Sequence, residues 1–105
     1  MINGDFPIPV HPGDLLQDIL DAAGITQSEL ARHLHIFPSK INEVCCRRRG
    51  ISAEMAFRLG RAFGQSPQFW MNAQANWELS QVEKGKYLRV KKLKIRTRIE
   101  GAEAA

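Results

Sequence analysis

Two short helices joined by a tight turn are predicted between Gly24 and Arg49, and this segment constrains the fold more than any other. Thr26 and Glu29 form a T-x-x-E capping box, in which each residue satisfies a backbone N–H of the other at a helix start. Apolar residues then recur at helical spacing, and Pro38 suits the first position of a second helix. This is the layout of a helix-turn-helix, whose second helix enters the DNA major groove.

The composition fits one domain with a modest apolar core, at 105 residues and 11.9 kDa. No apolar run reaches the roughly 18 residues of a membrane span, and the first ten residues lack the features of a signal peptide, so we expect a cytoplasmic protein. The only two cysteines, Cys45 and Cys46, are adjacent. A disulfide between them would close a strained ring and would not link distant parts of the chain, which excludes a disulfide scaffold.

Positive charge is concentrated in two segments, although the net charge is only +4. Residues 47–64 carry five basic side chains and one acidic, and residues 84–99 carry eight basic and none acidic. Residues 1–46, by contrast, carry two basic and six acidic side chains. A polyanionic partner would therefore meet the chain first after the second helix of the pair and in the C-terminal segment.

Five helices are expected from the spacing of apolar residues and from start and stop signals. Polar caps or prolines mark the starts, and glycines mark two of the ends. These signals place helices at about residues 12–23, 27–34 and 38–46, then between the cap Ser52 and the stop Gly64, and from Ser66-Pro67 onward.

The sequence period changes from helical to alternating after Gly85. Apolar and basic residues alternate from Leu88 to Ile99, with one slip at Lys91-Lys92. Period two with β-branched residues favours a C-terminal β-strand, which needs another strand, the helices or a second protomer to pair with. If none of these is available, the segment is a disordered basic tail. The expected roles of its basic residues are contact with DNA, binding of an acidic protein partner or keeping an edge strand soluble. The expected organisation is an extended arm (1–10), a helical domain (11–83) and a basic strand or tail (84–105).

The exposed face of residues 38–46 carries residue types that read bases. Ile41 and Val44 face inward by their spacing, which leaves the polar side chains outward. Asn pairs with adenine, Lys reaches guanine, and Glu accepts from the cytosine amine. The alternative is that these side chains only solvate a helix face. The candidate base-reading residues are Ser39, Lys40, Asn42 and Glu43.

Phosphate contacts are expected on both sides of the reading helix. Gln27 opens the preceding helix, where a backbone N–H and an amide side chain can reach a phosphate. Arg47, Arg48 and Arg49 directly follow the reading helix and suit phosphate clamping or entry into a groove. A solvated basic loop is the simpler alternative for these three arginines.

No constellation of residues indicates catalysis, a metal or a cofactor. Cys45-Cys46 lies near His33 and His35, but a zinc site needs about four convergent ligands, which one helical turn does not bring together. His11 is expected to cap the first helix. The chain has no glycine-rich phosphate loop, nucleophile elbow or paired-carboxylate motif. We therefore expect no enzyme activity.

The run GITQSELARHL…SKINEV resembles the helix-turn-helix of phage repressors and Xre-type regulators. The block ISAEMAFRLGRAFGQSPQFWMNAQANWEL, together with HPGDLLQDIL upstream, resembles the HigA family of antitoxins from bacterial type II toxin–antitoxin modules. The similarity covers about residues 8–79, and its most specific part is RLGRAFG-x-SP-x-FW-x-x-x-Q. It implies an all-α, five-helix, lambda-repressor-like domain that forms a homodimer. It also implies binding to a palindromic operator in double-stranded DNA, repression of its own operon and neutralisation of a HigB-like mRNA interferase.

Three departures from that family's pattern fall in the DNA-reading segment. His35 stands where such proteins usually carry Gly, and Phe37 stands where Ser or Thr usually caps the third helix. Cys45-Cys46-Arg47 replaces the usual Leu-Leu-Asn-Gly-like end of that helix. These departures motivate an alternative, a protein-interaction module that has lost DNA binding. A further alternative is a stand-alone Xre-type regulator without a toxin partner.

Overall fold

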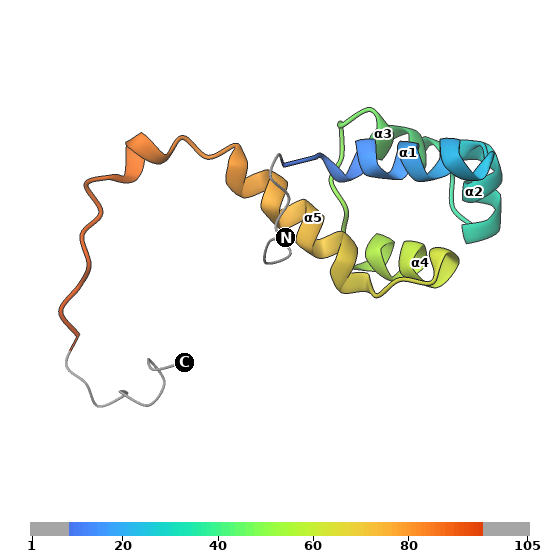
Figure 1. Cartoon of the computed structure of the whole chain (residues 1–105). Coiled ribbons are helices and arrows are strands. Elements are labelled where there is room, and N and C mark those ends of the chain that lie inside the picture. The colour runs from blue at the N-terminus through green and yellow to red at the C-terminus, as the bar shows by residue number, and fades with distance from the viewer. Residues whose placement is uncertain (1–8, 96–105) are drawn as a thin grey trace.

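Five α-helices and one short 3-10 helix make up the computed structural model, which describes residues 9–95. α1 packs against α3 and α5, α2 packs against α3, and α4 packs against α5 (Figure 1). The all-α, five-helix fold expected from the sequence is confirmed. The elements are α1 (Pro12–Ala23), α2 (Gln27–Leu34), α3 (Pro38–Cys45), α4 (Ala53–Phe63), α5 (Pro67–Ser80) and the 3-10 helix η1 (Lys84–Tyr87).

Local signals set most of the helix boundaries. His11 caps α1 as predicted, because its Nδ1 accepts from the Gly13 N–H at 2.8 Å. Gly24 and Gly64 adopt the left-handed conformation, with φ of 70° and 73°, directly after α1 and α4. Ser66 lies at the cap position of α5, but its side chain makes no capping hydrogen bond. The proline after it therefore does more to start α5 than the serine does.

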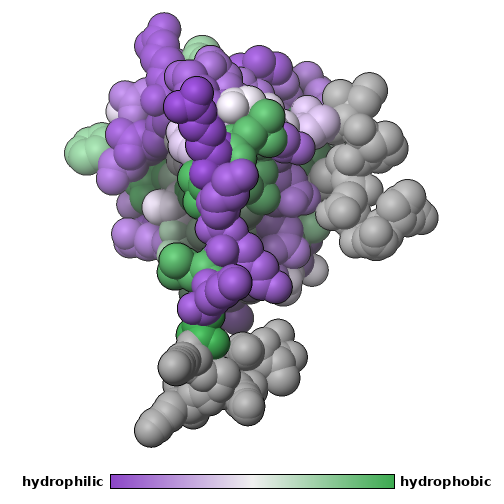
Figure 2. Space-filling view, turned by 90° about the vertical axis from the view of Figure 1, so that its left-hand side faces the viewer, coloured by the Kyte–Doolittle hydropathy of each residue, from purple (hydrophilic) through white to green (hydrophobic). Residues whose placement is uncertain are grey.

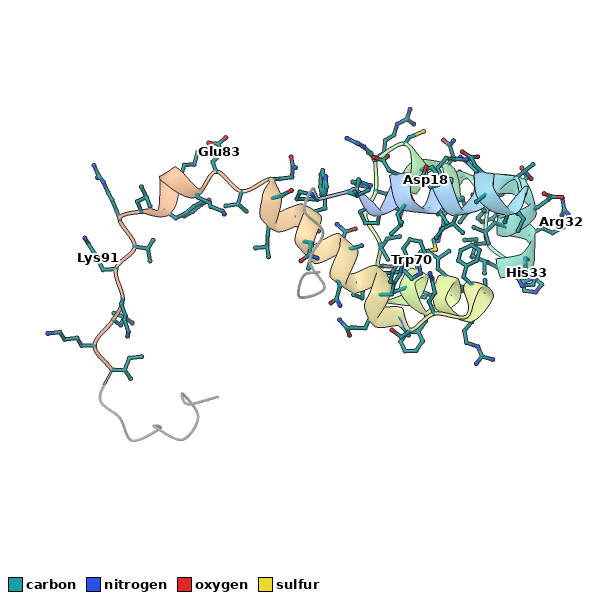
Figure 3. All side chains as sticks on the ribbon, in the orientation of Figure 1. Asp18, Arg32, His33, Trp70, Glu83 and Lys91 are labelled. Carbon is teal, nitrogen blue, oxygen red and sulfur yellow. The ribbon has the colours of Figure 1, made fainter. Side chains whose placement is uncertain are left out.

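One apolar core fills the space between the helices. Trp70 is its largest fully buried side chain, and its Nε1 donates to Gln65 Oε1 at 2.7 Å. Figure 3 shows Trp70 lying between α5 and the helices that face it. Removing this apolar surface from water is the main force that holds the bundle together. The other buried members are Leu16, Leu20, Leu30, Ala31, Leu34, Ile41, Val44, Ile51, Met55, Ala56 and Leu59.

A buried glutamine ties the loop after α3 to α5. Gln74 Oε1 accepts from the Ile51 N–H at 2.6 Å, and its Nε2 donates to Glu78 Oε2 at 2.7 Å. Gly50 lies so close that a Cβ there would be 2.6 Å from the Gln74 amide oxygen. The FW-x-x-x-Q pattern therefore has a structural reason: Trp70 fills the core, and Gln74 fixes the path of the chain after the arginine run.

After α5 the chain leaves the helices and extends away from them (Figure 1). No strand forms over residues 88–95, and residues 96–99 of the expected strand lie outside the described part. The alternation of residues is present, but the described part of the chain offers no second strand to complete the hydrogen bonds of a lone strand. Figure 2 shows this segment as hydrophilic residues interrupted by a few apolar ones. The apolar ones with high exposure are Leu88, Val90, Leu93 and Ile95.

The N-terminal arm expected over residues 1–10 lies almost entirely outside the described residues, so its extent stays a prediction. The same holds for the boundary between the helical domain and the basic segment. Over residues 9–95, no helix combines the length and the apolar character that crossing a bilayer requires.

Candidate nucleic-acid interface

The α2 helix starts at the complete capping box that the sequence predicts. Thr26 Oγ1 accepts from the Glu29 N–H at 3.0 Å, and Glu29 Oε1 accepts from the Thr26 N–H at 2.8 Å. Hydrogen bonding to the Glu29 carboxyl, first from the Thr26 backbone N–H and then from the Thr26 side chain, lowers the pKa of that carboxyl. Ala31 is fully buried on the side of α2 that faces the core. The start and the inner face of α2 therefore follow the helix-turn-helix expectation.

The turn between α2 and α3 keeps its shape although it lacks a glycine. His35 adopts the left-handed conformation, with φ of 59° and ψ of 43°. Its N–H donates to the Arg32 carbonyl at 3.2 Å, and the Ile36 N–H donates to the Ala31 carbonyl at 3.0 Å, which is a Schellman ending. A side-chain-bearing residue adopts this conformation at a cost of about 1–2 kcal/mol. The departure at His35 is thus absorbed as strain and leaves the turn intact.

The reading helix α3 has no side-chain cap at its N-terminus. Phe37 lies at the cap position, makes no capping hydrogen bond and is 74% exposed. At the other end Arg47, one residue past Cys46, is left-handed with φ of 63°. Its N–H donates to the Val44 carbonyl at 3.0 Å, and the Arg48 N–H donates to the Glu43 carbonyl at 2.8 Å, which is again a Schellman ending. Ile41 and Val44 are fully buried and hold α3 against its neighbours. Packing therefore positions the start of α3 in place of a side-chain cap.

The predicted base-reading residues share the outer face of α3, with one difference among them. Ser39, Lys40 and Asn42 are exposed, as expected, whereas Glu43 is half-buried. Glu43 Oε1 accepts from Arg49 Nε at 2.8 Å and from Arg49 Nη2 at 2.6 Å. To accept from a cytosine amine, Glu43 would have to share or release this arginine.

The three consecutive arginines point to different partners. Arg47 has a left-handed backbone, with φ of 63°, and forms an ion pair with Asp14 of α1. This pair lowers the pKa of the Asp14 carboxyl and raises the pKa of the Arg47 guanidinium. Arg49 pairs with Glu43, and Arg48 forms no ion pair within residues 9–95. Both pairs are exposed to solvent and weakly held, so a phosphate can compete for either arginine.

Gln27 connects α2 to the helices on both sides of it. Its Nε2 donates to Gln17 Oε1 of α1 at 2.8 Å, and its Oε1 accepts from Asn42 Nδ2 of α3 at 3.2 Å. The predicted phosphate-contacting residue and a predicted base-reading residue are therefore bonded to each other. The structure thus brings Gln27, Asn42, Glu43 and Arg49 into two hydrogen-bonded groups beside the outer face of α3.

Arg58 of α4 also borders this surface, although its sequence context gave it no role. Its Nη1 donates to the Leu34 carbonyl at the end of α2 at 2.8 Å, and its Nη2 donates to Glu54 Oε2 at 3.1 Å. A surface hollow brings it together with Phe37 and Lys40. The one sequence signal for Arg58 is its place at the head of the RLGRAFG block.

The adjacent cysteines form no reactive pair. Cys45 is half-buried, and burial raises the pKa of its thiol to about 11, so it packs as a neutral group. Cys46 is exposed, and both thiols are free. Over the described part of the chain, no group of three or more His, Cys, Asp or Glu is placed to hold a metal ion.

These features together define a helix-turn-helix DNA-binding protein: a capped α2, a tight turn, a polar outer face on α3 and arginines that flank it. The Virulence-associated protein I of Dichelobacter nodosus is 41% identical to the chain over 78 residues, which are 73% of this chain and 72% of that protein. PA4674 of Pseudomonas aeruginosa, solved in complex with its 28-bp operator DNA, is 40% identical with a TM-score of 0.76 over 82% of this chain and all of that one. The Pseudomonas aeruginosa antitoxin HigA, solved with the higBA promoter, is 38% identical with a TM-score of 0.74 over 85% of this chain and all of that one.

The chain belongs to the HigA family of helix-turn-helix antitoxins. No protein-family model matches it. The similar solved structures place the chain in the class of DNA-binding, antitoxin-like proteins and not among enzymes.

Proposed function

We propose that this protein is an antitoxin that binds a palindromic operator as a homodimer, represses its own operon and neutralises a HigB-like mRNA interferase. The observation that carries the DNA half of this proposal is the outer face of α3. That face presents Ser39, Lys40 and Asn42 to solvent on a helix held rigidly by the buried Ile41 and Val44. The toxin half rests on membership of the antitoxin family.

In the proposed complex, α3 lies in the major groove and its outward side chains meet base edges. Lys40 reaches the acceptors of guanine, Asn42 pairs with adenine, and Ser39 bonds to either. Two α3 helices of a dimer lie about one DNA turn, or roughly 34 Å, apart, which calls for a palindromic site. Glu43 contributes mainly by holding Arg49 beside the groove, since that bond is already made in the protein.

The phosphate contacts are proposed to come from Gln27 at the start of α2 and from the arginine run. Arg48 is exposed and forms no ion pair among the described residues, so it reaches a phosphate without breaking one. Arg47 and Arg49 must give up a carboxylate partner to bind a phosphate, which reduces their net contribution to the free energy of DNA binding. Arg48 is therefore the largest single contributor to the salt-dependent part of binding.

Titrations of the chain with a fluorescent duplex from its own upstream region test the DNA half. Arg48→Ala should weaken binding about threefold to tenfold on every sequence and reduce the salt slope by about one. Asn42→Ala should lose about tenfold of preference at one base pair per half-site while the salt slope stays the same. Arg61→Ala, which removes the same charge from an exposed position on α4, is the matched control. Wild-type affinity and slope in both test variants would remove α3 and its arginines from the interface.

Co-expression with the adjacent reading frame tests the toxin half. If that frame encodes the toxin, its expression alone should arrest growth, and expression of this protein should restore it. Arrest without rescue, or no arrest, together with intact operator binding would favour the stand-alone regulator. The structure removes the main motive for a module without DNA binding, because the turn and α3 both form despite His35 and Phe37. Absence of any gel shift at low salt would restore that alternative.

A further inference from the structure

A continuous series of side-chain hydrogen bonds runs across three helices to the outer face of α3. Asn42 Nδ2 donates to Gln27 Oε1 at 3.2 Å, and Gln27 Nε2 donates to Gln17 Oε1 at 2.8 Å. Gln17 Nε2 then donates to Asp21 Oδ1 at 2.9 Å, one turn further along α1. Cys46 lies at the other end, where its Sγ is 3.8 Å from Asn42 Oδ1.

All of these bonds point in the same direction, and Asp21 sets that direction. An ionised carboxylate can only accept hydrogen bonds, so Gln17 must turn its NH₂ group toward Asp21. The Gln17 oxygen then faces Gln27 and can accept only from an NH₂ group. Each amide in the series therefore has one permitted orientation, although an isolated amide could flip at little cost.

We propose that Asp21 and Gln17 of α1 are positioning residues that fix how the Asn42 amide presents its donor and acceptor to DNA. This inference rests on the proposed reading of a base by Asn42. One Asn42 N–H is committed to Gln27, which leaves its second N–H and its Oδ1 for a base. The Cys46 thiol is a weak donor at 3.8 Å, so a base can displace it from Oδ1.

The fixed orientation has a consequence for base preference. Adenine offers one acceptor and one donor on its major-groove edge, and the remaining N–H and Oδ1 of Asn42 match this pair. Guanine offers two acceptors there, which a flipped or mobile amide tolerates better than a fixed one. Asp21 is the last residue of the series, three hydrogen bonds away from Asn42. It therefore acts on base specificity without touching DNA. Weakening the series should relax the preference for adenine and leave phosphate contacts unchanged.

The test compares Asp21→Asn and Gln17→Leu with Asp18→Asn in the full-length protein. Asp18 is a neighbouring exposed carboxylate on α1 that makes no side-chain hydrogen bond within residues 9–95, and Figure 3 labels it. Asp21→Asn and Asp18→Asn change the net charge equally, so only the hydrogen-bond series distinguishes them. Each variant is used to select ligands from a duplex library with randomised base pairs. Affinities are then measured by anisotropy on the selected duplex and on single-base variants, as a function of salt.

Asp21→Asn and Gln17→Leu should lose about threefold to tenfold of discrimination at the one position where Asn42→Ala also loses it. Their salt slopes and melting temperatures should match those of wild type and of Asp18→Asn. Asp21→Glu, which keeps the carboxylate, should recover most of the preference. If Asn42→Ala changes the base preference and the α1 variants do not, the positioning role is wrong and base reading by Asn42 stands. If Asn42→Ala itself changes nothing, both the base reading and this inference fail.

Discussion

Two short neighbouring helices, α3 and α4, are held in place by different means. α4 begins at Ser52, whose side chain accepts from the Met55 N–H at 3.1 Å, and it ends at the left-handed Gly64. α3 begins at Phe37 without a side-chain cap and ends at Arg47, a left-handed residue that carries a side chain where α4 has a glycine. The two helices differ in length by only three residues, with 11 in α4 and 8 in α3. Local signals therefore fix both ends of α4, while the start of α3 depends on its surroundings.

This difference shows how the reading helix obtains its position. An isolated helix of eight residues is marginal in water, and α3 lacks the N-terminal side-chain cap that would partly offset this. Its buried Ile41 and Val44 and the close approach of α1 supply the missing stability. The orientation of the DNA-reading face is consequently coupled to α1.

The largest expected effect comes from filling the contact between α1 and α3. A Cβ on Gly13 would lie 1.8 Å from the Val44 carbonyl oxygen, so the two helices would have to separate. Gly13→Ala should lower the free energy of unfolding by about 3 kcal/mol or more, measured by urea denaturation. Gly85→Ala is the control, because a Cβ there meets nothing within 4 Å, and it should change stability by less than about 0.5 kcal/mol. Equal stability of the two variants would mean that α3 is not seated on α1.

The next effect concerns the other half of the molecule, where α5 anchors the loop that precedes α4. Gln74→Leu leaves the buried Ile51 N–H without its acceptor, which should cost about 1–3 kcal/mol in the free energy of unfolding. Gln68→Leu changes a glutamine on the exposed side of the same helix and should be nearly neutral. Denaturation of both variants under identical conditions measures the difference. A neutral Gln74→Leu would indicate that water replaces the glutamine at Ile51.

The same contrast explains what could be predicted from the sequence. The starts of the five α-helices were predicted correctly, because prolines and the caps Thr26 and Ser52 act within one turn of their own position. The 3-10 helix η1 was not predicted. The partners of the site residues were not predicted. Asp14 and Arg47 are 33 residues apart, and Gln27 and Asn42 are 15 apart, so no local pattern joins them. These pairings follow only from how the helices pack.

The arginine run and the C-terminal segment show the limits of composition. By charge alone the three arginines of residues 47–49 are equivalent. In the fold, however, Arg47 and Arg49 each have a carboxylate partner, and Arg48 has none within residues 9–95. Alternation alone favoured a strand from Leu88 onward, but residues 9–95 provide no partner strand for residues 88–95. A period in the sequence indicates which conformation a segment can adopt, and tertiary context decides whether it does.

A smaller effect should follow from giving α3 the cap that α4 already has. Phe37 has φ of −70° and ψ of 137°, which suits a capping serine, and its exposed ring gives up little buried area. Phe37→Ser should raise the free energy of unfolding by about 1 kcal/mol. Phe57→Ser, at another exposed position within α4, offers no cap and should not stabilise. Stabilisation by both changes would show that removing an exposed ring matters more than capping. Stabilisation by neither would show that a serine at residue 37 does not cap α3.

The smallest effect expected is a pH dependence that originates at the start of α1. His11 is buried, its Nδ1 accepts from the Gly13 N–H, and its ring contacts Trp77 edge-on with centroids 4.7 Å apart. Burial lowers the pKa of His11 below its usual 6.5, the positive charge of Arg47 lowers it further, and Asp14 opposes them. Protonation at Nδ1 would also remove the acceptor that caps α1.

The sign of this effect follows from which state binds more protons. Because the folded pKa of His11 lies below the unfolded value, the unfolded chain takes up its proton first as the pH falls. Stability contributed by His11 is therefore complete above about pH 6.5 and declines as the pH drops toward the folded pKa. The Asp14 carboxyl, whose pKa is lowered from 3.8, acts only at more acidic pH. The melting temperature should fall between pH 7.5 and pH 5, and His11→Asn, which can cap without titrating, should show a smaller fall. An identical fall in both proteins would show that the pH dependence arises at other residues. The stability of α1, and of the α3 helix that packs on it, would then not depend on the protonation of His11.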